Sequence, residues 1–132
     1  TGDANMKYLA ALLAGLAVAM PALAQLTDVH TAQQTRAQNA CPGLVSRHEA
    51  AAAAGKGSIY FSEDCSCVAD SITWEGWDEY TMEGTGEYMS EADAMLVADT
   101  LSSAPTIDDA MTIIYESISV PGSAVLSNCF AK

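Results

Sequence analysis

Cysteine is the residue in this sequence with the clearest potential for chemistry. The chain has four, Cys41, Cys65, Cys67 and Cys129, and two of them lie in the C-x-C spacing Cys65-Ser66-Cys67. Paired thiolates can exchange disulfides or bind a soft metal such as copper or zinc. One interpretation is therefore a redox or soft-metal-handling site at Cys65 and Cys67.

Structural disulfides are the other interpretation, and they explain all four cysteines together. An even number of cysteines in an exported chain is typical of a disulfide framework. A bridge between Cys65 and Cys67 would close a strained ring, so we expect each to pair with Cys41 or Cys129, in either combination. Helical residues two positions apart point about 200° from each other, so the bridges would pin a central helix on both sides. We predict structural disulfides.

Histidine and serine form no catalytic pattern. His30 and His48 are the only imidazoles, and both lie in polar or alanine-rich stretches where we expect solvated side chains. The G-x-S-x-G elbow of hydrolases and the C-x-x-C-H motif of c-type haem proteins are absent. We therefore predict no catalytic residue, no metal ligands, no cofactor and no enzymatic activity.

Four aromatic side chains lie in an acidic, glycine-containing stretch at 73–89: Trp74, Trp77, Tyr80 and Tyr88. One hypothesis is that these rings cap the helical core. The other is that they form an exposed patch with an acidic rim, a composition found at many protein-binding surfaces. The second hypothesis makes these four residues a candidate partner surface.

Negative charge dominates the chain. It has 17 Asp and Glu against five Lys and Arg, a net charge of −12 at pH 7, and no Lys or Arg lies between Lys56 and Lys132. Ten of the acids fall between Glu63 and Asp93. Such a surface would repel phosphates, which argues against nucleic acid and anionic membrane as partners. The acids either keep the protein soluble or bind a basic partner protein or a divalent cation.

Residues 1–24 have the layout of a bacterial Sec-type signal peptide. A lysine is followed by an apolar run at 8–20, and residues 21–24 end in an A-x-A cleavage site. The apolar run has 13 residues, whereas a membrane-spanning helix takes roughly 20. We expect cleavage after Ala24, no stable membrane anchor afterwards, and a periplasmic or secreted product.

The remaining residues, 25–132, are enough for one domain with a core. Alanine-rich and amphipathic segments with capping residues predict helices at 28–40, 44–54, 62–72, 91–102, 106–118 and 123–130. A further short helix is predicted near 77–82. Cys41-Pro42-Gly43 should interrupt the first two, since the residue before a proline disfavours helix.

The clearest helical periodicity follows Pro105. The core positions of the helix predicted at 106–118 should be Ile107, Met111, Ile114 and Ile118. The predicted fold class is all-α, a small disulfide-stabilised bundle of about four to five short helices with one irregular aromatic and acidic loop. No segment shows the sustained period-two alternation of a half-buried strand.

These features together predict a non-enzymatic periplasmic protein-binding domain, such as an inhibitor, an immunity-type antagonist or a small chaperone. The expectation combines export, disulfides, one-sided charge and the aromatic loop. The alternative is a redox or soft-metal-handling protein that uses Cys65 and Cys67.

Overall fold

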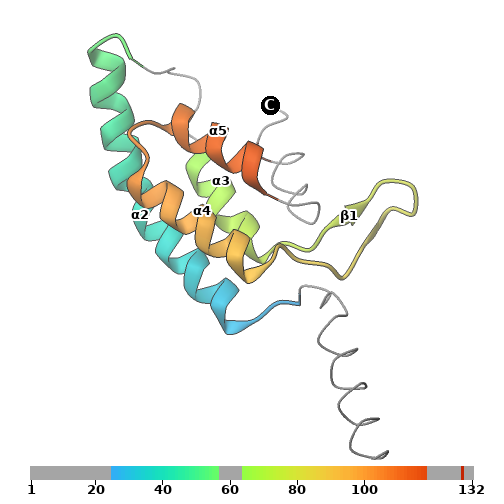
Figure 1. Ribbon diagram of the computed structural model, residues 1–132. Coiled ribbons are helices and arrows are strands. Elements are labelled where there is room, and N and C mark those ends of the chain that lie inside the picture. The colour runs from blue at the N-terminus through green and yellow to red at the C-terminus, as the bar shows by residue number, and fades with distance from the viewer. Residues whose placement is uncertain (1–24, 57–63, 119–128, 130–132) are drawn as a thin grey trace, which may run out of the picture.

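The computed structural model describes residues 25–56, 64–118 and 129, which form a helical bundle (Figure 1). The elements in chain order are α2 (Asp28–Ala53), α3 (Asp64–Asp70), the 3₁₀ turn η2 (Ser71–Thr73), β1 (Trp77–Asp78), β2 (Glu83–Gly84), α4 (Glu91–Ser103) and α5 (Ile107–Ser117). The predicted small, disulfide-stabilised all-α fold is confirmed.

Some predicted segments lie outside the described residues. These are the leader at 1–24 and, apart from Cys129, the last helix at 123–130. Within the described ranges, no helix is both long and apolar enough to cross a membrane.

The longest helix, α2, runs without a break through Pro42, so the predicted interruption is wrong. A proline removes one backbone N–H and crowds the preceding turn. Here Pro42 lies on the exposed side, while Cys41 and Leu44 are buried in the core and hold the helix on both sides of it. The helix ends at Ala53, and the predicted glycine cap follows at Gly55, whose φ of +79° is a left-handed conformation that glycine adopts without strain.

Hydroxyl caps open the next two long helices, as the sequence predicts. Ser90 Oγ accepts the N–H of Asp93 (3.0 Å) at the start of α4, and Thr106 Oγ1 accepts the N–H of Asp109 (3.1 Å) at the start of α5. Ala94, Val97, Ala98 and Leu101 of α4 are buried, and Met95 is 47% exposed.

The core lies where α2, α3, α4 and α5 meet (Figure 1). Its largest fully buried apolar side chains are Leu44, Ile72, Met89, Leu101, Ile107 and Ile114. The predicted core face of α5 is confirmed: Ile107, Met111 and Ile114 are buried, and Ile118 packs against them.

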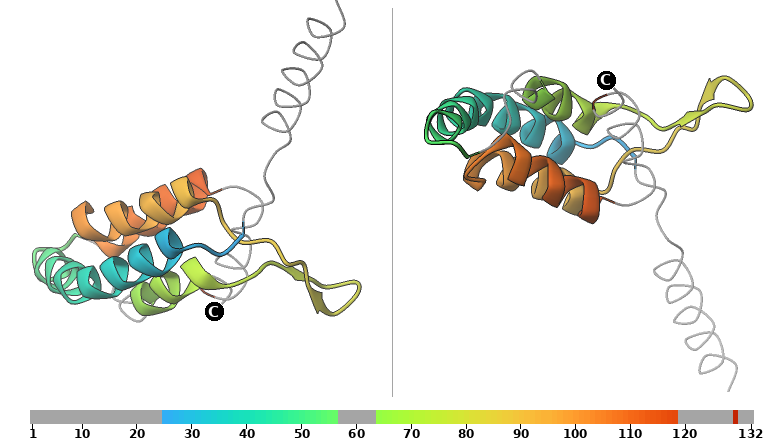
Figure 2. Two further views of the ribbon diagram at one scale, coloured as in Figure 1. Left: turned by 90° about the horizontal axis from the view of Figure 1, so that it is seen from below. Right: turned by 90° about the horizontal axis from the view of Figure 1, so that it is seen from above.

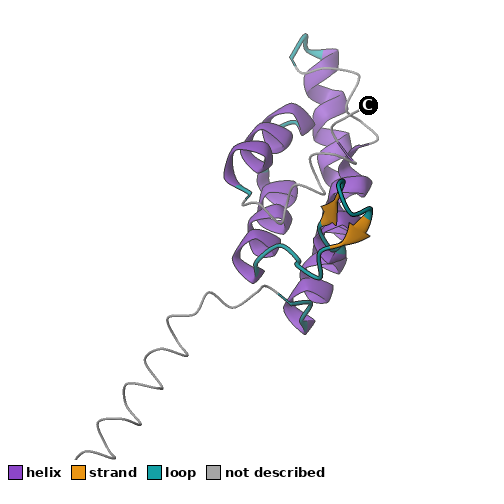
Figure 3. Ribbon diagram, turned by 90° about the vertical axis from the view of Figure 1, so that its right-hand side faces the viewer, coloured by secondary structure: helices purple, strands orange, loops and turns teal. Residues whose placement is uncertain are grey.

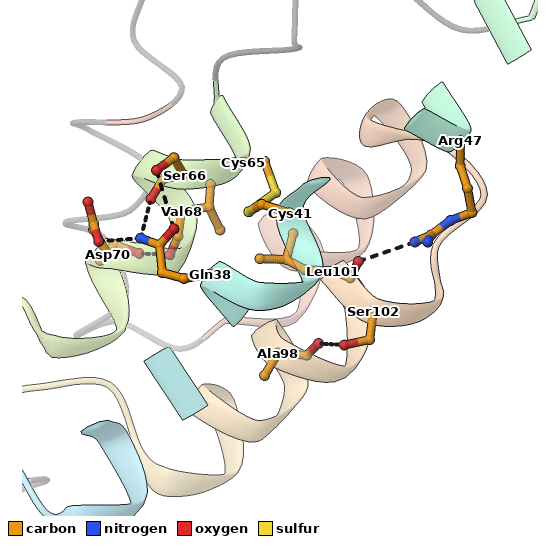
Figure 4. Close-up of a disulfide and its surroundings, with 11 residues drawn as sticks. Gln38, Cys41, Arg47, Cys65, Ser66, Val68, Asp70, Ala98, Leu101 and Ser102 are labelled. Atoms are coloured by element: carbon orange, nitrogen blue, oxygen red, sulfur yellow. Dashed lines mark hydrogen bonds between the residues drawn. A yellow bond between two sulfur atoms is a disulfide. The ribbon is translucent and has the colours of Figure 1, made fainter. Parts of the chain in front are cut away.

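Two disulfides fasten the short helix α3. Cys65 is bonded to Cys41 of α2 (Figure 4), and Cys67 is bonded to Cys129, with Cα atoms 5.7 Å apart in both bridges. Each cysteine of the C-x-C pair thus takes one outer cysteine, as predicted. A helix of seven residues is too short to be stable by itself, so these covalent links and the core contacts hold it in place.

Between η2 and α4 the chain forms a β-hairpin (residues 75–87), so the short helix predicted there is wrong. β1 and β2 pair antiparallel, with Trp77 opposite Gly84 and Asp78 opposite Glu83. The hairpin projects away from the helices in both views of Figure 2.

Candidate functional site

The tip of the hairpin (residues 79–82) is an ordered turn. Asp78 Oδ1 accepts the N–H groups of Tyr80 (2.8 Å) and Thr81 (3.4 Å), and the Asp78 carbonyl accepts the N–H of Met82 (2.8 Å). Aspartate commonly fixes turns in this way, by bonding to the backbone two residues further on. The tip side chains are therefore presented on a defined backbone.

Three large side chains of the hairpin lie in solvent. Tyr80 is 100% exposed, Met82 68% and Trp77 52%, and we term them the apolar patch. The hairpin carrying them faces the viewer in Figure 3. Single exposed apolar residues are ordinary on protein surfaces, whereas several on one projecting element make it a candidate contact site.

The four aromatic residues singled out in the sequence divide into two pairs. Trp77 and Tyr80 belong to the apolar patch. Trp74 is half-buried against the core, and the half-buried ring of Tyr88 lies edge-on to that of His30, with centroids 6.5 Å apart. The second pair anchors the base of the hairpin. The third exposed side chain of the hairpin is Met82, and no feature of the neighbouring sequence predicts its exposure.

Glu75 ties the two arms of the hairpin together. Its Oε2 accepts the N–H of Gly86 (3.1 Å), and its carboxylate lies against Gly84, where any Cβ would overlap it. A second link is the bond from Thr85 N–H to the Gly76 carbonyl (2.8 Å). A side chain at position 84 would therefore displace the Glu75 carboxylate from this position.

Carboxylates surround the apolar patch. Those of the hairpin are Glu75, Asp78, Glu79, Glu83 and Glu87. Asp78 and Glu83 lie directly opposite each other across the strands, where Cβ atoms are about 4.5–5.5 Å apart. Like charges in this relation destabilise a hairpin.

Both arginines of the described chain are bonded to α4. Arg36 forms an ion pair with Asp99 (2.6 Å). Arg47 donates to the carbonyls of Leu101 (3.3 Å) and Ala104 (2.9 Å) at the C-terminal end of α4, as Figure 4 shows for Leu101. These hydrogen bonds and this ion pair lie within the helical bundle, away from the hairpin.

Both histidines are buried, so their predicted solvated positions are wrong. His30 Nδ1 accepts the N–H of Thr27 (3.1 Å), which places the ring proton on Nε2, and Nε2 donates to the Met89 carbonyl (2.6 Å). His48 Nδ1 accepts the N–H of Ile107 (3.1 Å) at the start of α5. Each ring bonds backbone groups of the fold.

All four cysteines are in disulfides and none is free. The C-x-C pair therefore presents no thiolate in the oxidised protein, although thiolates are what metal binding and disulfide exchange require. Within the described ranges, no three His, Cys, Asp or Glu side chains are grouped to hold a metal ion. Of the seven large apolar side chains exposed among the described residues, three lie on the hairpin.

Replacing Met82 with glycine should stabilise the hairpin. Met82 has a φ of +57°, in the left-handed region that costs an L-residue about 1–2 kcal/mol and leaves glycine unstrained. A gain of about 1 kcal/mol corresponds to roughly fivefold slower hydrogen exchange at the amides of residues 82 and 85. Met82→Ala keeps the Cβ and serves as the control, with unchanged exchange. Faster exchange in the glycine variant would contradict the prediction.

Quenching of tryptophan fluorescence should report the charge around Trp77. Caesium ions concentrate near carboxylates and iodide is repelled by them. We therefore expect Trp77 to be quenched more by caesium, and less by iodide, than free N-acetyltryptophanamide is. Trp77→Phe should remove this difference, because Trp74 is half-buried. If, at low salt, caesium and iodide each quench Trp77 to the same degree as they quench N-acetyltryptophanamide, then negative charge is not concentrated around the ring.

Comparison of the chain with protein-family models, with curated proteins and with solved structures finds no match.

Proposed function

We propose that this chain is an exported, non-enzymatic protein-binding domain that contacts a basic partner through its hairpin. The observation that carries the proposal is the apolar patch, in which Trp77, Tyr80 and Met82 are exposed on an ordered element that projects from the fold (Figures 1 and 2). Inhibitors, immunity-type antagonists and small chaperones all work by contacts of this kind.

The composition of the patch supports protein contact. Tyrosine, tryptophan and methionine are enriched in protein interfaces, and tyrosine and tryptophan carry much of the binding energy. Tyr80 has no surface covered in the free protein. A buried aromatic ring removes roughly 150–250 Å² from water, and truncating an aromatic ring that anchors an interface costs about 2 kcal/mol or more.

The acidic rim supports a basic partner. The hairpin carries five carboxylates and no Lys or Arg. Complementary charge speeds association and selects against partners of the same sign.

The positions and bonds of the histidines and cysteines support a non-enzymatic role. His30 and His48 are buried and bonded to backbone groups, and the cysteines are bridged. General bases and nucleophiles need an accessible atom beside the substrate. These side chains instead stabilise the fold.

The disulfides and the leader pattern together support export. Disulfides persist in oxidising compartments such as the periplasm and the cell exterior. Residues 1–24 have the signal-peptide layout, and the two bridges cross-link the rest of the chain. We therefore place the working protein in the periplasm or outside the cell.

A pull-down from an extract of exported proteins, carried out at low and at high salt, tests this function. We expect a basic protein to be retained by the oxidised chain at low salt and to be lost with Tyr80→Ala. This substitution leaves the fold intact because the Tyr80 side chain is fully exposed.

Tyr115→Ala is the matched control, since Tyr115 of α5 is 61% exposed and lies off the hairpin. It should retain the partner. Equal recovery with both variants would move the contact away from the hairpin, and recovery of no protein at either salt concentration would refute the proposal.

A further inference from the structure

The hairpin has two chemically different faces. Side chains that pair across the strands lie on one face, and successive residues alternate. Trp77 therefore shares a face with Gly84 and with the Glu75 carboxylate that packs there. Asp78 and Glu83 share the opposite face, and Tyr80 stands at the turn between the two arms.

Two features of this element reduce its own stability. Met82 holds a left-handed backbone that favours glycine, and Asp78 and Glu83 are like charges at directly opposite positions of the two strands. A partner would reduce the repulsion between Asp78 and Glu83 by placing a cationic group against both carboxylates. It would also cover the exposed Met82. Features that cost stability in the free protein are expected where a surface is shaped for a ligand.

The shape of the element restricts the partner surface. The hairpin stands out from the helices as a narrow projection in Figures 1, 2 and 3. A flat surface would cover only one of its faces. Covering Trp77, Tyr80 and Met82 while also reaching Asp78 and Glu83 requires a concave surface that receives the tip.

We propose that the hairpin is a plug that enters a concave site on a cationic protein, with Tyr80 in an apolar pocket and Asp78 and Glu83 against Lys or Arg at its rim. This inference rests on the proposed function and gives it a mode of action. The apolar pocket would cover the fully exposed Tyr80 ring, and the cations would face the two opposed acids of the strands.

Photo-crosslinking tests where the tip lies. A benzophenone amino acid replaces Tyr80 in one variant and the exposed Ala50 of α2 in the control, and both oxidised chains are irradiated with an extract of exported proteins. We expect a basic protein to be linked from position 80 only, at a residue inside a concave site with Lys or Arg at its rim.

The outcomes separate the two proposals. No link from position 80 above the level from position 50 would refute hairpin-mediated binding altogether. A link from position 80 to a flat or convex surface of the partner, or to an acidic protein, would refute the plug while leaving hairpin-mediated binding in place.

A charge-neutralising variant tests the rim contact on the purified pair. Glu83→Gln should weaken the Kd about tenfold and reduce its salt dependence, whereas Glu49→Gln, the same change at an exposed position of α2, should stay within about twofold of the unmodified chain. Removal of the like-charge pair should also slow amide exchange in the hairpin. A merely unfolded hairpin would exchange faster, so weaker binding with slower exchange supports the rim contact, and unchanged binding overturns it.

Discussion

Removing the second disulfide with Cys67→Ala/Cys129→Ala should lower the free energy of unfolding by about 4 kcal/mol. This bridge joins residues with a sequence separation of 62. In the chain-entropy model a cross-link restricts the unfolded chain more strongly as the closed loop lengthens. Urea denaturation of the oxidised protein measures the change, which is a large share of the 5–15 kcal/mol typical of a whole domain.

The first disulfide supplies the matched control. Cys41 and Cys65 are separated by 24 positions, so Cys41→Ala/Cys65→Ala should cost about 3 kcal/mol. Full reduction removes both cross-links, and the combined loss of about 7 kcal/mol should unfold the domain. A smaller effect for the longer loop than for the shorter one would contradict the argument from chain entropy.

The parts of the fold that the sequence predicts well depend on neighbouring residues. Caps at Ser90 and Thr106 and the helix end at Gly55 are set by side chains or backbone angles within a few positions. The core face of α5 is set by helical periodicity. Such local rules need no knowledge of what packs against the segment.

The errors on α2 come from contacts that are distant in sequence. Its polar composition predicts a solvated, interrupted helix, yet its polar side chains reach the next segments. Gln38 bonds the Ser66 carbonyl (3.3 Å) and the Asp70 carboxylate, and Gln34 bonds Thr73 Oγ1 (3.1 Å) (Figure 4 shows the Gln38 bonds). A polar stripe that packs by hydrogen bonds has the same composition as a solvated one. Only the tertiary arrangement distinguishes them.

The candidate site was accessible to sequence reasoning in part. The composition of the aromatic and acidic stretch marks it as a candidate region, but its strands have two residues each, too few for alternation to appear. Whether a ring in such a stretch is exposed depends on how the hairpin leaves the core. That is why Trp74 and Tyr88 proved half-buried while Trp77 and Tyr80 are exposed.

Replacing His30 with alanine should lower the free energy of unfolding by about 3 kcal/mol. The ring is fully buried, and its loss leaves the Thr27 N–H and the Met89 carbonyl without their partner. A buried polar group left unpaired costs about 1–3 kcal/mol. His30→Gln, whose amide nitrogen can donate to Met89, should recover part of the loss.

His48→Ala is the control that separates general stability from the hairpin. The two histidines lie about five turns apart on α2, so they share one face of it and bond the chain at the two ends of α4. Both substitutions remove a buried ring. Only His30 bonds Met89, at the base of the hairpin, and packs edge-on to Tyr88.

His30→Ala should therefore loosen the hairpin as well as the fold. We expect faster hydrogen exchange at the Gly76 amide, which bonds the Glu87 carbonyl (2.7 Å), and weaker partner binding, whereas His48→Ala of equal instability should leave that amide protected. Equal exchange at Gly76 in the two variants would show that the hairpin is fixed by its own bonds. A difference would mean that a ring at the start of α2 sets the position of the surface proposed to bind the partner.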